Sequence, residues 1–394
     1  MKNFSFRVPT EIVFGKDTHL ETAALVQKHG GSRVLLVYGG GSAAASGLLE
    51  QIQGQLDRCG LAYLAYGGVR PNPVLSHVRE GVRQAAAFGA DFILAVGGGS
   101  VIDEGKAIAI GLSNPDTDLW KFWEREAALT RALPVGAVLT ISAAGSETSD
   151  SAVLTNDALG RKRGLSSPLI VARFAVMNPE LTFTLPKYQI ACGVVDMMMH
   201  TMDRFFTQTD GNETTDELAA ALLRVVIRNG RLALQNPADY GAMSELMWCG
   251  SLSHNGLMGL GRPRDFSVHQ LGHELSGRFD VAHGASLSAM WGSWARYCCP
   301  SDPARFARFA DMVWGVDTPD APAEGVRRTE QYFASLGMPV CLPELGMGVL
   351  SGEVIGELAD SCVFYGKRRV GDFRPLERED AAKIYQMANM PRDS

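Results

Sequence analysis

Residues 91–100 read Asp91-Phe92-Ile93-Leu94-Ala95-Val96-Gly97-Gly98-Gly99-Ser100, an apolar run of strand length that stops at three glycines. A second run of the same kind, Arg33-Val34-Leu35-Leu36-Val37-Tyr38, stops at Gly39-Gly40-Gly41. Apolar residues on both faces of a strand are typical of a parallel sheet covered by helices on each side. Further apolar runs at 137–141 and 174–177, with helical spacing over 75–89, continue the alternation of strand and helix. The pattern predicts an open, mainly parallel, Rossmann-like α/β sheet.

The pattern changes near residue 186, where strand-like runs nearly vanish. Beyond this point amphipathic helices are predicted over residues 186–207, 213–234, 238–259, 265–276, 285–299 and 303–314. No proline- or serine-rich linker separates the two halves. We therefore expect an α/β domain over residues 1–186 and an all-α domain over residues 187–394, with a cleft between them.

The N-terminal residues show a third pattern. Phe4, Phe6, Val8, Ile12 and Phe14 all fall on even positions. This period of two predicts a hairpin or an edge strand outside the central sheet. Its apolar face suits pairing with a second subunit, or equally the covering of its own domain.

Composition argues against several classes of protein. The chain carries 37 Lys and Arg against 43 Asp and Glu, a net charge of −6 without a basic block, which argues against nucleic acid as a partner. No apolar run approaches the ~20 residues that span a bilayer, and no signal-peptide pattern opens the sequence. The seven scattered cysteines indicate reduced thiols, so we expect a cytoplasmic protein without a membrane partner.

The turn at Gly97 to Ser100 is followed by residues in helical register, which outlines a site for a phosphate group, and residues 39–44 fit a looser form of the same glycine motif with Ala44 in the third glycine position. Glycines let the backbone approach an anion, and the N–H groups of a helix N-terminus favour it. A single glycine turn after a strand often binds nothing, but two such turns in one α/β half favour the binding of a nucleotide. Because Gly39 to Ser42 contain no carboxylate to repel a 2′-phosphate, NADP is favoured over NAD. Alternatively, these glycines only provide space and carry no information about the cofactor.

One carboxylate and four histidines are spaced for a common site in the helical half. Asp196 and His200 lie four residues apart on one helix face, as do His269 and His273, and His283 follows in a turn. Apolar neighbours predict that this face is buried, and a buried Asp needs an ion pair, a hydrogen-bond network or a metal. One carboxylate and three imidazoles suit a divalent metal with an open position, which leaves one histidine over. The remaining histidines are expected at the surface or in helix packing: His19, His29, His77 and His254.

Together these motifs make the chain resemble the iron-containing (group III) alcohol dehydrogenase family from end to end. The resemblance rests on Phe6 to Gly15, Gly97 to Asp103, Gly145-Ser146-Glu147, Asp196-x-x-x-His200, His269-x-x-x-His273 and His283-Gly284. Two further stretches are similar to the butanol-dehydrogenase-like, NADP-dependent aldehyde reductase branch: Tyr38 to Ser42 and Cys362-x-x-Phe364-Tyr365-Gly366.

The resemblance implies roles for individual residues. Asp196, His200, His269 and His283 would hold one divalent metal, Fe²⁺ or Zn²⁺, with Mn, Co or Ni as further choices, and His273 would stand unligated beside the nicotinamide. The implied cofactor-binding residues are Gly39, Gly40, Gly41, Ser42, Asn72, Gly97, Gly98, Gly99, Ser100, Asp103, Thr140, Ser149, Lys162 and Leu181. The family's Thr-Thr-Ala-Gly-Thr stretch is replaced by Thr140-Ile141-Ser142-Ala143-Ala144, which removes hydroxyl groups there. Without the family, Lys162 between Arg161 and Arg163 would be interpreted as a solvated basic turn.

The expected activity is hydride transfer between NADP(H), preferred over NAD(H), and a small primary alcohol or aldehyde, mainly as an aldehyde reductase. The resemblance to the family also implies a homodimer. Two alternatives stay open. A lyase similar to dehydroquinate synthase shares the scaffold but needs basic residues for its phosphorylated, carboxylated substrate, whereas these helices are rich in Met, Trp and Leu. A non-catalytic protein would bind NADPH and metal without turnover.

Overall fold

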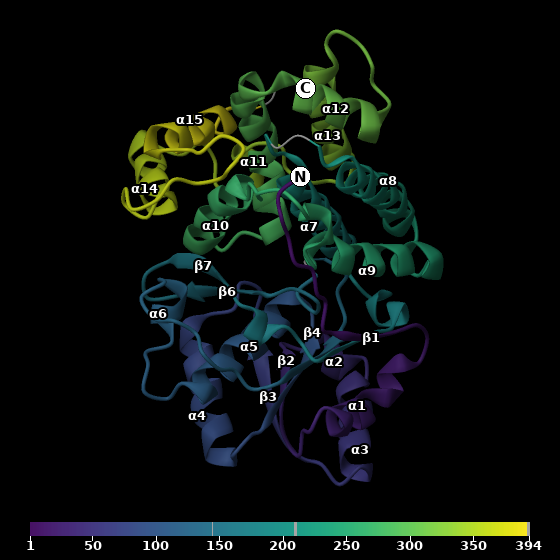
Figure 1. The fold of residues 1–394 in the computed structure, drawn as a ribbon. Coiled ribbons are helices and arrows are strands. Elements are labelled where there is room, and N and C mark those ends of the chain that lie inside the picture. Colours follow the sequence, from purple (N-terminus) through teal and green to yellow (C-terminus); the bar gives the residue numbers. More distant parts are fainter. Residues whose placement is uncertain (144, 209–210, 392–394) are drawn as a thin grey trace. The chain divides into compact units, whose positions relative to one another are not determined.

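The structure is a computed structural model that describes residues 1–143, 145–208 and 211–391. Its contacts divide the chain into two compact units (Figure 1). The α/β unit holds residues 7–185 and 237–251, and the helical unit holds residues 1–6, 186–236 and those from 252 onward. Residues 1–6 thus belong to the helical unit although they precede residue 186, and residues 237–251 belong to the α/β unit although they follow it.

The α/β unit is built on a six-stranded sheet in which every pairing is parallel. In spatial order its strands are β1 (Glu11–Phe14), β8 (Phe174–Met177), β5 (Val135–Leu139), β4 (Phe92–Gly97), β2 (Arg33–Gly39) and β3 (Ala62–Val69). The predicted open parallel sheet is therefore confirmed. The prediction that the N-terminal strand lies outside this sheet is wrong, because β1 pairs with β8 and forms the edge.

Alternate residues of the strands enter two separate apolar cores. Leu35 and Ile93 pack with α4 (Leu75–Phe88) and α5 (Gly99–Ser113). Val34 and Phe92 pack instead with α1 (Thr22–Lys28) and α3 (Leu48–Arg58). Figure 1 shows α4 and α3 on opposite sides of the sheet. Burial on both faces explains why these strands are apolar throughout.

Both glycine turns lie at the carboxyl ends of neighbouring strands. β2 pairs with β3 on one side and with β4 on the other, so the chain leaves β2 in one direction along the sheet and β4 in the opposite direction. Such a reversal opens a crevice at the carboxyl ends of the strands, where open α/β sheets bind their ligands. A short α2 (Ser42–Ala45) follows the first turn, and an antiparallel hairpin of β6 (Ser151–Asn156) and β7 (Arg161–Ser166) follows β5.

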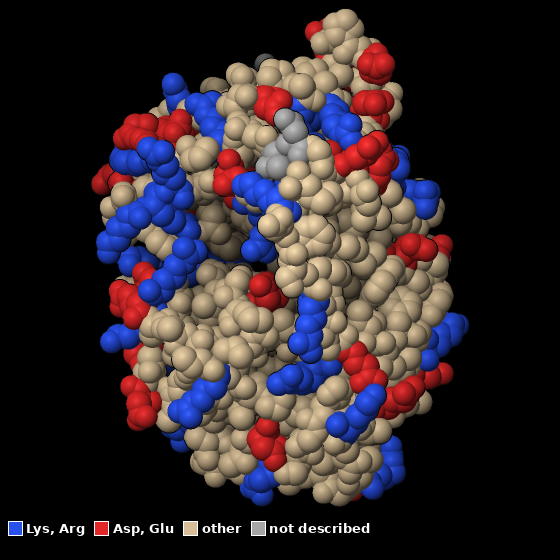
Figure 2. All heavy atoms as spheres, viewed as in Figure 1, with Lys and Arg blue, Asp and Glu red and all other residues tan. Residues whose placement is uncertain are grey.

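Helices make up the second half of the chain, as predicted. They are α7 (Lys187–Phe205), α8 (Glu213–Gln235), α9 (Tyr240–His254), α10 (Ser267–Phe279), α11 (His283–Cys298), α12 (Pro303–Trp314), α13 (Ala321–Ser335), α14 (Gly352–Cys362) and α15 (Arg378–Ala388). The last three lie beyond the spans predicted from the sequence. None of the helices in the described part of the chain is long and apolar enough to cross a membrane. On the face drawn in Figure 2, basic and acidic side chains are interspersed.

Candidate metal and dinucleotide sites

Three helices of the helical unit bring one carboxylate and three histidines together. Asp196 and His200 belong to α7, His269 to α10, and His283 is the first residue of α11. The Nε2 atoms of the three histidines lie 3.3, 3.5 and 3.7 Å, respectively, from Oδ1 of Asp196. In a tetrahedral site with metal–ligand distances of about 2.1 Å, neighbouring ligand atoms are about 3.4 Å apart. The spacing therefore matches that around a shared divalent cation.

Hydrogen bonding within this cluster is incomplete. Oδ1 of Asp196 and Nε2 of His269 are buried, and neither makes a hydrogen bond with any residue that the structure describes. A buried polar atom without a partner costs about 1–3 kcal/mol, and more when it is charged. A cation bound between these atoms removes that cost. The residues present therefore fit a metal ion.

A glycine allows the helices to approach one another closely here. A β-carbon at Gly284 would lie 2.3 Å from the carbonyl oxygen of Cys192 on α7. Because Cys192 precedes Asp196 by about one helical turn, a larger residue at position 284 would push His283 away from Asp196. His283 is predicted in a turn but instead begins α11, since the helical register extends back to it from the residues that follow.

Two residues that the sequence analysis did not select support the histidines. Asp203, seven positions after Asp196 on α7, accepts a hydrogen bond from Nδ1 of His269. Carboxylates commonly hold metal-binding histidines in this way, with the other ring nitrogen free for the ion. His254 stacks on His200 with ring centroids 3.8 Å apart. The expectation that His254 stands apart from the cluster is therefore wrong, because the last turn of α9 carries it there.

Burial and neighbouring charges shift the pKa values of two of these histidines in opposite directions. Burial lowers the pKa of His200 well below its ordinary value, and the neighbouring His254 and His269 lower it further. Burial also acts to lower the pKa of His269, but the negative charges of Asp203 and Asp196 and the hydrogen bond to Asp203 outweigh it and raise that pKa to about 9. Two carboxylates thus supply negative charge to a set of imidazoles, an environment that favours a cation.

His273 lies beside the cluster, one turn after His269 on α10. Its ring centroid is 6.3 Å from that of His269 and 5.3 Å from that of His283, and its ring plane is inclined by 84° to that of His269. Among the described residues, the group with ligand atoms close enough to share an ion contains Asp196, His200 and His269. His273 is a neighbour of this group. His283 lies at the outer edge of this group and is not part of it; its side chain is 24% exposed, and its Nε2 is the farthest of the three from Asp196.

In the α/β unit, the predicted dinucleotide residues gather at the carboxyl ends of the strands. A β-carbon on Gly40 or Gly41 would meet nothing within 4 Å, so the first glycine turn leaves open backbone for a ligand. In the second turn, a β-carbon on Gly97 would lie 2.4 Å from Val101, so packing under α5 also requires glycine there. The backbone N–H of Thr140 donates to the carbonyl of Gly97 at 3.0 Å and ties the end of β5 to this turn.

Lys162 and Asn72 meet although 90 positions separate them. Nζ of Lys162 donates to Oδ1 of Asn72 at 2.8 Å. The hairpin that carries Lys162 is joined to the loop after β3 by a hydrogen bond from Thr155 to the carbonyl of Pro73. Lys162 is only 4% exposed, so the interpretation as a solvated basic turn is wrong. An ammonium group buried near the end of β3, the neighbour of β2, suits the binding of an anion.

Two predicted cofactor residues are bonded within the protein. The carboxylate of Asp103 accepts hydrogen bonds from the Ser146 hydroxyl at 2.5 Å and from the backbone N–H of Val153 at 2.9 Å. The carbonyl of Ser149 accepts from Nζ of Lys106, a fully buried lysine that the sequence analysis did not select.

The remaining predicted cofactor residues are placed as follows. Gly99 and Ser100 begin α5, and Leu181 packs, partly buried, against the core beneath α1 and α3. The side chain of Ser42 and the whole of Ala144, which ends the altered 140–144 stretch, lie outside the described residues.

Comparison with known proteins assigns both halves of the chain to one family. Residues 9–179 match the family model for iron-containing alcohol dehydrogenase, and residues 190–389 match the model for the C-terminal part of the Fe-containing alcohol dehydrogenase family. NADH-dependent butanol dehydrogenase A of Clostridium acetobutylicum is 35% identical, over 98% of this chain and 99% of the relative. NADPH-dependent aldehyde reductase YqhD of Escherichia coli is 32% identical, over 98% of this chain and 100% of the relative.

Solved structures agree with this assignment. The crystal structure of NADH-dependent butanol dehydrogenase A from Thermotoga maritima matches with a TM-score of 0.94 at 32% identity, over 99% of both chains. That of YqhD matches with a TM-score of 0.93 at 31% identity, over 98% of this chain and 99% of that one. The family implies a nicotinamide dinucleotide and a divalent metal. The chain belongs to the iron-containing alcohol dehydrogenase family and is an oxidoreductase of that family.

Proposed function

We propose that the protein is a metal-dependent oxidoreductase that transfers a hydride between NADP(H) and a small primary alcohol or aldehyde, acting mainly as an aldehyde reductase. The observation that carries this proposal is the placing of three imidazole nitrogens within 3.7 Å of one carboxylate oxygen in a buried cluster. Family membership supports the reaction class, since the relatives include butanol dehydrogenases and an aldehyde reductase.

The proposed metal ligands are Asp196, His200, His269 and His283. Fe²⁺ and Zn²⁺ are the expected ions, and this ligand set also accepts manganese, cobalt or nickel. When bound, the ion supplies Lewis-acid polarisation of a carbonyl group. Asp203 orients His269 so that its Nε2 points toward Asp196. The apolar character of α7 favours a small apolar aldehyde over a phosphorylated, carboxylated substrate.

His273 is the proposed proton donor and acceptor. It is buried next to two of the proposed ligands, His269 and His283, and an imidazole can hold or release a proton near neutral pH. In aldehyde reduction His273 would deliver a proton to the substrate oxygen, and in alcohol oxidation it would remove one.

We propose that the α/β unit, within residues 1–186, binds the dinucleotide, and that the helical half, 187–394, carries the metal and the substrate. When bound, the nicotinamide supplies or accepts the hydride. The glycine turns at Gly39 to Ser42 and Gly97 to Ser100 would approach the phosphates, with the following residues completing the site: Asn72, Asp103, Thr140, Ser149, Lys162 and Leu181. The first turn contains no carboxylate and Lys162 is a buried cation, which together favour NADP over NAD.

We also propose a homodimer located in the cytoplasm. β1 is an edge strand, and no strand of the described residues pairs with its outer side. Phe14 on β1 is 40% exposed, and an unpaired edge with an exposed aromatic residue suits pairing with a second copy. All seven cysteines are free thiols, the state kept in a reducing compartment. Light scattering during size-exclusion chromatography measures the oligomeric state, and we expect the mass of a dimer.

The test is NADPH oxidation with butanal, followed by absorbance, on apoprotein reloaded separately with Fe²⁺ and Zn²⁺, with NADH in parallel. We expect turnover only in the presence of a metal, and a higher kcat/KM for NADPH than for NADH. Binding of NADPH without turnover on either metal or any short aldehyde would contradict the reaction. A higher kcat/KM for NADH would contradict only the cofactor preference.

A variant separates the role of His273 from that of the ligands. His273→Ala should lower turnover while the content of bound metal, measured by elemental analysis, stays that of the unaltered protein. Loss of the metal from this variant would make His273 a ligand and overturn its assignment to proton transfer.

A further inference from the structure

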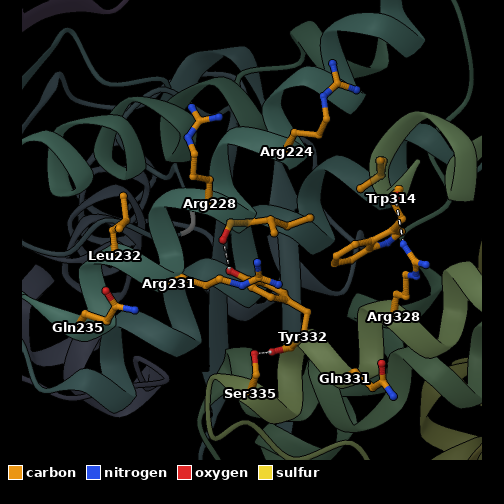
Figure 3. Close-up of a pocket in the computed structure, with 12 residues that line it drawn as sticks. Arg224, Arg228, Arg231, Leu232, Gln235, Trp314, Arg328, Gln331, Tyr332 and Ser335 are labelled. Carbon is orange, nitrogen blue, oxygen red and sulfur yellow. Dashed lines mark hydrogen bonds between the residues drawn. The ribbon is translucent and has the colours of Figure 1, made fainter. Parts of the chain in front are cut away.

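The helical unit contains a groove that the proposed function does not use. Helices α8 and α13, with the end of α12, line a cavity of about 740 Å³. Figure 3 shows Arg224, Arg228 and Arg231 along α8 on one side of it, and Trp314 and Arg328 on the other. The groove lies on helices other than α7, α10 and α11, which carry the proposed metal ligands.

The lining of this groove is strongly basic. Of its 12 residues four are arginines and none is acidic, although the protein as a whole has a net charge of −6. Arg224, Arg228 and Arg231 are separated by four and then three positions, which places them on one face of α8. Like charges at this spacing repel one another and weaken a helix. An anion bound along this face would relieve the repulsion.

Elsewhere in the helical unit, several arginines are paired with carboxylates. The Asp216 carboxylate alone contacts three of them: Arg262, Arg305 and Arg308. Two others pair singly, Arg296 with Glu330 and Arg278 with Glu357. Charge pairing is thus the common arrangement in this unit.

The groove departs from this arrangement. Arg328 pairs with Glu324, and Arg224 donates to a backbone carbonyl. Neither Arg228 nor Arg231 has a carboxylate partner among the described residues, and both are exposed. Two guanidinium groups therefore face the groove with their hydrogen-bonding capacity open.

Aromatic rings complete the walls of the groove. The ring of Tyr332 is buried, and the guanidinium of Arg231 lies 5.3 Å from its centroid. The Tyr332 hydroxyl donates to the carbonyl of Ile227 at 3.1 Å, and the indole N–H of Trp314 donates to the Thr329 hydroxyl at 3.0 Å. Because the polar atoms of both rings are bonded within the protein, the arginines are the principal groups available to a ligand.

We propose that this groove binds a polyphosphate group, either free or carried by a small organic molecule. Guanidinium groups donate paired hydrogen bonds to phosphate oxygens. From Arg224 to Arg231 the helix rises about 10 Å, so more than one phosphate is needed to reach all three arginines of α8. A cavity of this size lies within the range of small-molecule sites.

The test is calorimetric titration of the full-length, metal-loaded protein with inorganic tripolyphosphate at an ionic strength of about 0.15 M. We expect saturable binding that the double variant Arg228→Gln/Arg231→Gln weakens about a hundredfold, or about tenfold for each arginine. A parallel titration with guanosine triphosphate distinguishes the two forms of ligand. Tighter binding of the nucleotide points to an organic carrier packed on the rings, and equal binding points to the phosphate chain alone.

The matched control is Arg79→Gln/Arg83→Gln, which removes the same charge from two exposed positions one helical turn apart on α4. Here each arginine is paired, with Asp118 and Glu80 respectively, and we expect affinity for tripolyphosphate within about twofold of the unaltered protein. The KM for NADPH should be the same in both double variants, which shows that the dinucleotide site is separate. No saturable binding to the unaltered protein, or an equal loss in both variants, overturns the proposal.

Discussion

The two units each bury a cluster of charged groups, and the two clusters are built in opposite ways. In the α/β unit, the Lys106 ammonium donates to the carbonyls of Ser146, Ser149 and Ser151 at 2.7, 3.0 and 2.8 Å. In the helical unit, Oδ1 of Asp196 and Nε2 of His269 face each other without hydrogen bonds. The Lys106 ammonium finds its hydrogen-bond partners within the chain, and we call its surroundings the closed cluster. Asp196 and its neighbouring histidines leave ligand atoms for a group from outside, and we call them the open cluster.

Burial alone does not distinguish these clusters, since Lys106, Asp196 and His269 are all at most 4% exposed. The difference lies in whether the polar atoms have partners, because a fold rarely leaves buried polar atoms unbonded without a reason. Glu147, near Lys106, is an exception in the α/β unit: its Oε2 has no hydrogen bond, and burial raises the pKa of its carboxyl group. Four experiments test this difference between the Lys106 cluster and the Asp196–histidine cluster.

The largest expected effect comes from the open cluster. Asp196→Asn keeps the shape of the side chain and removes the negative charge that all three histidines face. We expect turnover to fall about a thousandfold, equivalent to about 4 kcal/mol, together with loss of bound metal. Asp311→Asn, at an exposed position on α12, is the control and should keep both. Normal metal content in Asp196→Asn would contradict the assignment of this carboxylate as a ligand.

In the closed cluster a substitution should reduce stability without affecting the metal. Lys106→Met leaves three carbonyls and the nearby carboxylate of Asp103 without their cation. Removing one partner of a buried charged group costs about 3–5 kcal/mol, which urea unfolding of the apoprotein measures. Metal content should be unchanged. If Lys106→Met unfolds as easily as the exposed control Lys121→Met, the closed cluster does not stabilise the fold.

A smaller effect on metal binding is expected at Asp203, which holds His269 of the open cluster in place. Asp203→Asn retains an oxygen that can accept from Nδ1 of His269 but removes the charge. Changes of this kind typically lower metal affinity by about 10- to 100-fold. Competition with a chelator measures the affinity, and the decrease should be smaller than that in Asp196→Asn. Equal affinities in Asp203→Asn and the unaltered protein would show that Asp203 only packs against the ring.

The smallest effect is a pH dependence of stability from the closed cluster. Burial lowers the pKa of Lys106 to about 8 in the folded protein, although Asp103, Glu147 and Asp150 oppose the shift. In the unfolded chain a lysine titrates near ~10.4, so between these values the unfolded state binds more protons. The cost of burying the charge is present in full below the folded pKa and is relieved as pH rises toward the unfolded value.

The free energy of unfolding should therefore rise with pH between these values relative to Lys106→Met, by at most about 1.4 kcal/mol per pH unit. Urea unfolding of both proteins across this range measures the difference, in which the other titrating groups cancel. Parallel pH profiles would show that Lys106 keeps an ordinary pKa.

Local patterns in the sequence were sufficient for the parallel sheet, both glycine turns and the helical second half. Each depends on the spacing of neighbouring residues, since strands repeat every two positions and helices about every 3.6. The same rule placed Asp196 with His200, and His269 with His273, on single helix faces. It did not find β3, whose apolar run is interrupted by Gly67 and Gly68, or the β6–β7 hairpin with its charged strand.

Contacts between distant segments were decided only by the tertiary structure. Asp203 lies on the same face of α7 as Asp196, so its spacing was visible in the sequence, but its bond to His269 depends on how α7 and α10 pack. The pairing of β1 with β8 and of Lys162 with Asn72, and the stacking of His254 on His200, have the same origin. Local spacing determines which residues share a face, whereas close packing of side chains from the whole chain determines which faces meet.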